Sequence, residues 1–510
     1  MRTLYLYALT VITAFISLNA DARNDTEGYT VNYEASLTAG AGSGEFAPYY
    51  ISSMRHGRFS QQYNAQAEGK IWRPMQTDGR FSYGFGIDMI AGYSSDVEYQ
   101  RYDNIKDVWY LHSERPAAGW IQQLYGEVKY RSLFAQLGLR ERGSALLNQR
   151  LTSGDLVESG NARPIPQLRA GFIDFQDIPF TQGWVQIQGE LAYGPMTDGD
   201  WWKNHFNRFN YHVASGVWYN YKRLYLRTNP AKPFSVTVGM QASAMFGGTT
   251  DYYADGSLFR SEKRSLRAKD FFRAFFPAQG EGYYTGNHVG SWDFNARYRL
   301  ADGTLLKAYF SWPWEDGSGI GRQNGWDGLW GIEYKAPDPW LISGAVVEYL
   351  DFTNQSGPIH YSPSDHPGAT LNGKATGCDN YYNNDNYNSY ANYGMSIGTP
   401  ALMSPIYDTG GMLIFRTNLM RGVHVGIEGC ITPDIDYRVK GGYRKSWGSA
   451  YYLLPEPVHQ TSVMAEANFR LPKVAEGLSV NLMLEVDRGK MPCNATGAMV
   501  TVRYNGSFKF

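Results

Sequence analysis

The final stretch, residues 498–510, constrains the fold of this chain more than any other segment. Alternate positions share one face of an extended chain: Val500, Val502, Tyr504, Gly506, Phe508 and Phe510. The residues between them are polar or charged, and a period of two predicts a strand with one apolar and one wet face. We expect this strand to close a barrel in lipid, because hydrocarbon tolerates no unpaired strand edge. The alternative is the last strand of a soluble sandwich.

The first 22 residues predict a secretory signal peptide. Arg2 supplies the positive start, residues 4–18 form an apolar run too short to span a membrane, and Ala20 and Ala22 frame a cleavage site. We therefore expect cleavage near Ala22 and a mature chain of residues 23–510 in the bacterial cell outer membrane. Within it, residues 23–66 are expected to supply the first strand and part of a plug.

The composition fits such a barrel and argues against several soluble classes. Aromatic residues make up 15% of the chain, as expected for the aromatic girdles at the two membrane interfaces. The mean hydropathy of -0.42 is compatible with a barrel, since every second strand residue is polar. A net charge of -1 argues against a nucleic-acid partner.

Alternating segments recur from end to end, and we expect about 18 strands of the length that a tilted membrane strand needs. The connections between them alternate between short turns, such as 301–303, and long loops, such as 94–121, 142–167, 247–289, 351–410 and 448–459. Short periplasmic turns and long extracellular loops are typical of outer-membrane barrels. The predicted fold is an all-β transmembrane antiparallel barrel with a small helical or loop plug. Charged residues on the lumen faces form structural ion pairs or line a sugar-selective channel.

The cysteines and acidic residues predict no cofactor. Cys378 and Cys493 fall in predicted exterior loops, so they either form a disulfide with each other or remain free thiols together with Cys430. The Asp/Asn run at 378–388 lacks the spacing of a calcium loop, so no metal site is expected. His212 and Ser215 lie on opposite faces of a strand and cannot share a proton there, so no enzyme is expected.

One stretch resembles a known family. Residues 159–167 (Ser-Gly-Asn-Ala-Arg-Pro-Ile-Pro-Gln) are similar to the Asn-Ala-x-Pro-x-Pro core of Wzi-type capsule assembly proteins, and further segments fit in the same order across the mature chain. The Asn- and Tyr-rich segment 351–410 resembles a Bacteroidetes-type branch. Asn220 departs from the family, which often has His there. The resemblance implies an outer-membrane barrel of about 18 strands, a partly filled lumen and a lectin-like role.

Sugar binding needs flat apolar faces for the rings and planar polar groups for the hydroxyls. The loop residues that supply this mixture are Trp201, Trp202, Trp314, Trp326, Arg322 and Asn324, and the motif adds Asn161, Arg163 and Gln167. The alternatives are an interfacial girdle for the Trp residues, which we favour for the neighbouring Trp312, and a plug without ligand contact for the motif.

The expected function is to bind capsular or other surface polysaccharide and help attach or assemble it at the cell surface. The alternative is a porin or carbohydrate-selective uptake channel. The expected partners are the polysaccharide, outer-membrane lipid and lipopolysaccharide, and the barrel-assembly machinery during biogenesis.

Overall fold

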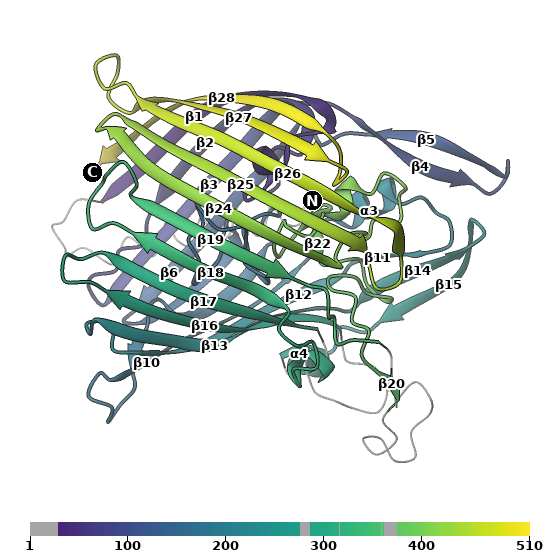
Figure 1. Cartoon of the computed structure of the whole chain (residues 1–510), viewed down its shortest axis with the longest axis horizontal. Helices are drawn as coiled ribbons and strands as arrows, with labels where there is room; N and C mark the ends of the chain where they lie inside the picture. The colour runs from purple at the N-terminus through teal and green to yellow at the C-terminus, as the bar shows by residue number, and fades with distance from the viewer. Residues whose placement is uncertain (1–28, 276–285, 316, 359, 362–374) are drawn as a thin grey trace.

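The computed structural model describes residues 29–275, 286–315, 317–358, 360–361 and 375–510. The predicted signal peptide lies outside these residues. One antiparallel sheet closes on itself into a barrel of 18 strands (Figure 1). In ring order, the strands are β1 (Thr30–Phe46), β2 (Gln61–Arg73), β3 (Phe81–Ser94), β6 (Gly119–Tyr130), β7 (Leu133–Leu139), β8 (Gln167–Phe172), β10 (Val185–Pro195), β12 (Trp218–Thr228), β13 (Phe234–Phe246), β16 (Asn287–Arg299), β17 (Leu305–Trp314), β18 (Gly328–Lys335), β19 (Gly344–Asp351), β24 (Met420–Thr432), β25 (Ile435–Gly448), β26 (Leu453–Arg470), β27 (Leu478–Gly489) and β28 (Ala495–Lys509). The two-residue β9 (Gln176–Asp177) continues β8 along β10.

The last strand closes the barrel, as the sequence predicts. β28 pairs with β1 in continuous antiparallel register from Thr30 opposite Lys509 to Gly42 opposite Gly497. At the seam, the rings of Tyr29 and Phe510 stack with centroids 5.0 Å apart. Every strand edge of the barrel is thereby paired, which satisfies the backbone in a medium without water.

The two faces of the wall differ as the period of two requires. On β28, Val500, Val502 and Tyr504 face outward and are exposed, whereas Thr501 faces the interior and is buried. The interior carries charged side chains that pair across strands. Arg169 bonds both Glu158 and Glu190, with N···O distances of 2.6 Å. These pairs favour the first alternative for the lumen charges, structural ion pairs, over a sugar-selective channel.

The connections sort the barrel into two ends. Short connections gather at one end, here called the turn end, and the long loops gather at the other, here called the loop end. The two segments that pair as β1 and β28 begin and finish at the turn end. The connection predicted to be long at 448–459 is instead a tight hairpin of residues 449–452, because β25 and β26 continue further than the sequence pattern indicates. Among the described residues, no helix is long and apolar enough to cross a membrane.

Three loops fold into the lumen and fill it, and together they form the plug. They are residues 47–60, which contain helix α2 (Tyr49–Ser52); residues 140–166; and, of the connection 352–419, the described residues 352–358 and 377–419, which contain β22 (Ala391–Asn392), β23 (Met395–Ser396) and the short helix η2 (Pro405–Tyr407). The second loop descends almost to the turn end, where Arg150 pairs with Glu428 at 2.6 Å.

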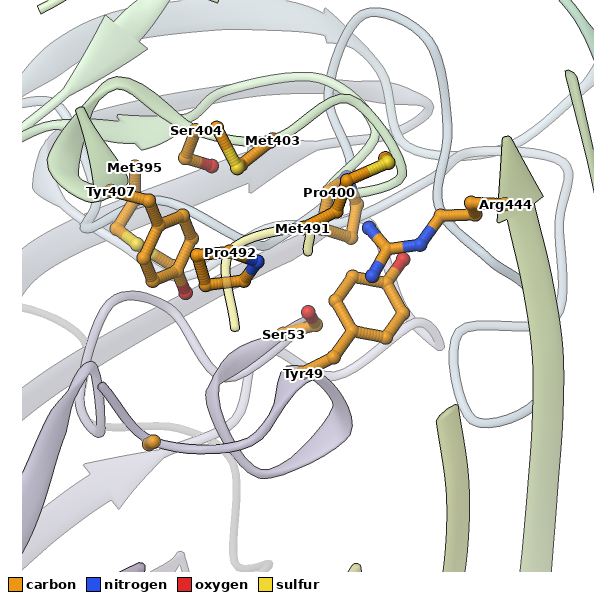
Figure 2. A pocket seen from close by; sticks show the side chains of 11 residues that line it. Tyr49, Ser53, Met395, Pro400, Met403, Ser404, Tyr407, Arg444, Met491 and Pro492 are labelled. Carbon is orange, nitrogen blue, oxygen red and sulfur yellow. The ribbon is translucent and has the colours of Figure 1, made fainter. Parts of the chain in front are cut away.

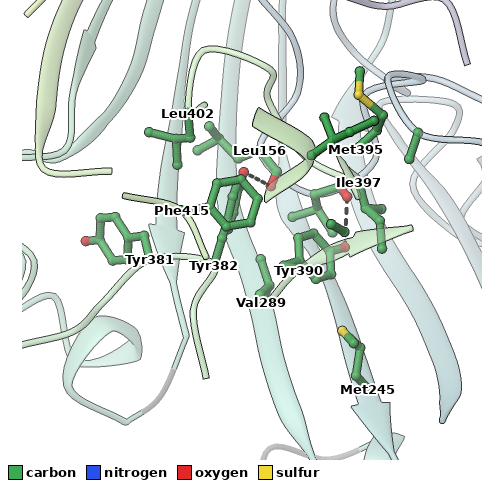
Figure 3. Close-up of a cluster of buried hydrophobic side chains, with 14 of the residues drawn as sticks. Leu156, Met245, Val289, Tyr381, Tyr382, Tyr390, Met395, Ile397, Leu402 and Phe415 are labelled. Carbon is green, nitrogen blue, oxygen red and sulfur yellow. Dashed lines mark hydrogen bonds between the residues drawn. The ribbon is translucent and has the colours of Figure 1, made fainter. Parts of the chain in front are cut away.

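Apolar packing joins the plug to the wall. In Figure 3, Tyr382, Tyr390 and Phe415 of the longest plug loop pack with Leu156 of the second loop and with Met245 and Val289 of the wall. The Tyr hydroxyls are also satisfied: Tyr390 donates to the carbonyl of Val157 at 2.9 Å. Buried Tyr residues need such partners, so the many Tyr residues of loop 352–419 serve the interior as well as the predicted girdles.

Carboxylates of the wall hold the plug by its backbone. Glu348 on β19 accepts hydrogen bonds from Thr152 Oγ1, from the amide of Ser153 and from Tyr309, each at 2.6 Å. Glu485 on β27 accepts from the amides of Tyr50 and Ile51 at 2.7 Å, at the start of α2. A carboxylate that meets free amides in a buried site forms strong, charge-assisted bonds.

The cysteines do not pair. Cys378, Cys430 and Cys493 are all free thiols in the structure, so the disulfide considered between Cys378 and Cys493 is not formed. Cys378 lies beside the β25–β26 hairpin, where its carbonyl accepts from Tyr451. Cys493 lies in the next hairpin and faces Gly44 of β1. The loops that carry the two residues are thus anchored to different parts of the rim.

We predict that Glu348→Ala loosens the second plug loop and leaves the barrel intact. Loss of the carboxylate leaves a buried amide and two hydroxyls without their acceptor, at about 1–3 kcal/mol for each unsatisfied group. Hydrogen exchange of residues 148–156 should accelerate, while heat-modifiable electrophoretic mobility stays unchanged. Glu456→Ala, at an exposed position on β26, is the matched control. Unchanged exchange in Glu348→Ala would contradict this tether.

Candidate functional site

The motif at residues 159–167 lies inside the barrel and joins all three plug loops. Asn161 is fully buried; its Oδ1 accepts from the amide of Met54 at 3.1 Å, and its Nδ2 donates to the carbonyl of Ser396 at 3.1 Å. Both ends of this amide are therefore occupied by protein. Asn161 therefore holds the plug together and has no polar group left to contact a ligand.

Arg163 and Gln167 line a small polar cavity beside the motif. Gln167 is itself engaged, since its Oε1 accepts from Arg169 at 3.0 Å. The guanidinium of Arg163 lies between the rings of Trp120 and Tyr393, 4.2 and 4.8 Å from their centroids. Burial lowers the pKa of Arg163 to about 10. Arg140 and Arg142 share the lining with a single acidic residue, Glu158, so the cavity suits a small anionic group.

A second, smaller cavity is largely apolar (Figure 2). Met395, Met403 and Met491 line it, and the guanidinium of Arg444 lies 3.8 Å from the ring centroid of Tyr49. This crevice separates the first and third plug loops from the β27–β28 hairpin. Its lining offers few hydrogen-bonding groups and does not suit a sugar.

Three of the predicted Trp residues are packed into the protein. Trp202, in helix α3 (Gly199–His205), is buried, and its Nε1 donates to Asp198 at 2.7 Å. Trp201 stacks on His205 with centroids 4.0 Å apart, and its indole edge lies against Gly394. Trp314 is fully buried against Gly290, where an added Cβ would lie 2.2 Å from the ring. The structure therefore assigns these rings to packing.

The remaining loop candidates lie at the outer face of β17 and β18. Trp326 is 69% exposed and stacks on Trp312, and Arg322 lies 5.9 Å from the same Trp312 ring. This outward aromatic cluster matches an interfacial girdle. Asn324 is buried: its Oδ1 accepts from Trp312 Nε1 and its Nδ2 donates to the Pro313 carbonyl. The nine predicted residues thus do not form one site.

The structure reveals another candidate, here called the crown, at the loop end. The crown consists of two hairpins that project beyond the barrel (Figure 1), β4 (Val97–Asp103) with β5 (Val108–Glu114) and β14 (Gly248–Ala254) with β15 (Ser257–Arg264), and of residues 206–211 between them. The turn of the second hairpin reaches the first: a Cβ added at Gly256 would lie 2.3 Å from the ring of Tyr102, so only glycine fits there.

Three aromatic rings from separate segments meet in the crown. Trp109 lies 5.3 Å from Tyr102 and 4.9 Å from Phe209 between ring centroids, and the latter two lie 4.8 Å apart. Trp109 remains 48% exposed. The other two rings hold it in place, so it presents an apolar surface to solvent without loss of further side-chain freedom.

Carboxylate and amide groups surround these rings. Asp107 accepts from the hydroxyl of Tyr102, and Asn104 donates to Ser257 at 3.5 Å across the two hairpins. Asp103 accepts from the amides of Ile105 and Lys106, which lowers the pKa of its carboxyl. An exposed aromatic ring beside fixed planar polar groups is the combination that sugar recognition requires.

From the sequence we expect residues 94–121 and 247–289 to be long loops without strands, so both hairpins of the crown are missed. The signal was present: residues 97–103 and 108–114 are rich in aromatic and β-branched residues, and the turn between them carries Asp103, Asn104 and Asp107. That pattern predicts a hairpin. The contact of Trp109 with Phe209 has no local signal, because it joins segments about a hundred residues apart.

The comparison with solved structures supports the fold. No protein-family model matches the sequence, and no curated protein matches it. The solved structure of Wzi, an outer membrane protein involved in group 1 capsule assembly in Escherichia coli and a carbohydrate-binding β-barrel, is 11% identical with a TM-score of 0.55; the match covers 97% of this chain and 88% of that chain. OccAB2 of Acinetobacter baumannii is 8% identical with a TM-score of 0.47, covering 94% of this chain and 98% of that chain.

The likeness to Wzi extends over nearly the whole chain and shows a shared barrel fold. Together with the closed 18-strand sheet, it gives this protein the fold of an outer-membrane β-barrel.

We predict that the stability of helix α3 depends on the ionisation of Asp198, which also accepts from the amide of Tyr393. Burial raises its pKa from 3.8 to about 6, so this group contributes stability that is full below pH 4 and is lost as the pH rises through 6. Across this pH range, the contribution of Asp198 to the free energy of unfolding falls by about 3 kcal/mol.

Hydrogen exchange of the α3 amides, corrected for intrinsic rates, should therefore be slower at pH 5 than at pH 7 relative to Asp198→Asn. Burial also lowers the pKa of His205 to about 4, and this makes the helix more stable as the pH rises. Because Asp198→Asn leaves His205 in place, this effect is the same in both proteins. The difference between the two proteins isolates Asp198. An equal pH profile in both would contradict the prediction.

Proposed function

We propose that this protein is a plugged outer-membrane barrel that binds surface polysaccharide at its crown and helps to attach it to the cell. The exposed ring of Trp109, fixed by Tyr102 and Phe209 and flanked by polar groups, is the observation that carries the proposal. It gives a sugar ring an apolar face to stack on and hydroxyl partners within reach. Wzi, which shares the fold, is a carbohydrate-binding β-barrel, and this supports the same class of ligand.

The plug favours attachment over transport. Three loops occupy the lumen, and wall carboxylates bind their backbone amides or, near the turn end, the side chain of Arg150. A permeation path through such an interior requires those buried bonds to break, at a cost for each unsatisfied group. A barrel of this kind offers its rim, rather than its lumen, to a long polymer.

We predict that Trp109→Ala weakens polysaccharide binding about tenfold or more, through loss of the stacking face. The assay is binding of the purified, detergent-solubilised protein to capsule or exopolysaccharide isolated from the same organism. Trp340→Ala is the matched control, because Trp340 is 65% exposed in the β18–β19 turn at the opposite end of the barrel. Equal affinity of Trp109→Ala and the wild type would remove the crown from the proposal.

In cells, a deletion strain should still make the polysaccharide but release more of it into the medium. The Trp109→Ala protein should restore retention poorly, and Trp340→Ala should restore it fully. Unchanged retention in the deletion strain would reject the attachment role.

We predict that the wild-type protein is silent in planar bilayers. A variant in which residues 144–158 are replaced by a short Gly-Ser linker should show steady open steps, because the segment that descends to the turn end is gone. Large steady steps from the wild type would instead favour the channel function and reject a closed plug.

A further inference from the structure

Helix α4 (Ala268–Phe275) lies on the outside of the barrel wall. The loop between β13 and β16 turns back after β15 and lays this helix against β12 and β13 near the loop end (Figure 1). The ring of Phe271 contacts Trp218 at 5.1 Å and Phe246 at 5.2 Å between centroids. Tyr193 donates to the carbonyl of Phe271 at 2.8 Å. The helix is thus fixed by both packing and hydrogen bonds.

The alternation of side chains along β12 shows that α4 covers the outer face of the wall. Its odd-numbered residues point inward, since Tyr219 bonds Tyr390 of the plug. Its even-numbered residues face outward: Leu224 is 51% exposed, whereas Lys222, one step nearer the loop end, is buried beneath α4. Lys222 Nζ donates to the carbonyl of Ala274 at 3.0 Å. The exposed apolar band of the wall therefore begins where the helix finishes.

The segment that leads into α4 is strongly basic. Residues 260–273 contain six basic side chains against two acidic ones, a net charge of +4 in a chain whose total is -1. Glu262 pairs with Arg260 and Arg264. Asp270 is used at the start of the helix, where its carboxylate accepts from Ser265 and from the amide of Arg267.

Four of the basic side chains are left for other ligands. Lys263, Arg267, Lys269 and Arg273 are exposed, and none has a carboxylate partner among the described residues. Phe272, on the same short helix, is 68% exposed. An amphipathic helix with basic residues beside an exposed aromatic ring, at the edge of a lipid-facing surface, has the properties of an interfacial membrane anchor.

We propose that α4 and the segment before it bind the phosphate groups of a phosphorylated membrane glycolipid in the outer leaflet. Lys263, Arg267, Lys269 and Arg273 receive the phosphates, and Phe272 enters the boundary of the acyl chains. Arg and Lys match phosphate in charge and hydrogen-bonding geometry. Lys263 lies at the base of the crown hairpin β14–β15, where it pairs with Thr249, and the other three basic residues lie outside the crown, so the barrel would hold lipid at its flank and polymer at the aromatic rings of its rim.

The test is native mass spectrometry of the full-length protein titrated with bis-phosphorylated lipid A, with its dephosphorylated form as the comparison. The test variant replaces Lys263, Arg267, Lys269 and Arg273 with Gln. The control replaces Lys106, Arg115, Lys203 and Lys490 with Gln, because these exposed residues also lie in loop-end connections and remove the same charge. Retained heat-modifiable mobility shows that each variant folds.

We expect the test variant to bind the bis-phosphorylated lipid at least about tenfold more weakly than the wild type, and the control to bind as the wild type does. The dephosphorylated lipid should not distinguish the three proteins. Equal lipid binding by test and control variants would overturn the proposal. So would a loss of affinity for the isolated polysaccharide with unchanged lipid binding, which would assign the segment to the polymer.

Discussion

The hydrogen-bonded pairing of β1 with β28 is the constraint on which the rest of the structure depends. It removes the last free edge of the sheet, and only a closed sheet satisfies its backbone in hydrocarbon. Closure also divides the side chains of every strand between lipid and lumen. The lumen of an 18-strand barrel is wide, so its polar lining needs either water or protein to complete its hydrogen bonds. Here protein fills it.

The plug is held by polar bonds and by apolar packing, and the two kinds of contact have different roles. Wall carboxylates such as Glu348 and Glu485 receive backbone amides and fix the path of the loops. Tyr-rich packing between loop 352–419 and the wall excludes water from the centre. Because many aromatic side chains of the loops are buried in the plug, an aromatic ring that stays exposed at the loop end is a candidate for ligand contact. Trp109 is such a ring, and it differs from Trp312 and Trp326 in its position, because it lies on the β4–β5 hairpin that projects beyond the barrel, whereas the other two stack at the outer face of the wall.

Much of the wall could be predicted from the sequence, and little of the site could. Strand alternation identified the faces of β28, the barrel class and the strand count, since a period of two is a local property. The β25–β26 connection was misjudged, because residues 453–459 were assigned to the loop although β26 begins at Leu453, which pairs with Gly448 of β25. Trp202, Trp314 and Asn324 were predicted to be ligand contacts from composition alone. Their burial depends on Asp198, Gly290 and Pro313, which local patterns do not connect to them.

The sequence by itself determined that this chain forms a membrane barrel, because alternation, strand length and connection length are all written in neighbouring residues. It also placed the polar motif 159–167 inside the protein or at its rim. Only the tertiary structure decided which loops fill the lumen, which aromatic rings stay exposed, and that helix α4 lies on the outer wall over Lys222. The reason is physical: whether a loop side chain is buried depends on contacts with residues far away in the chain, and those contacts exist only once the barrel has closed.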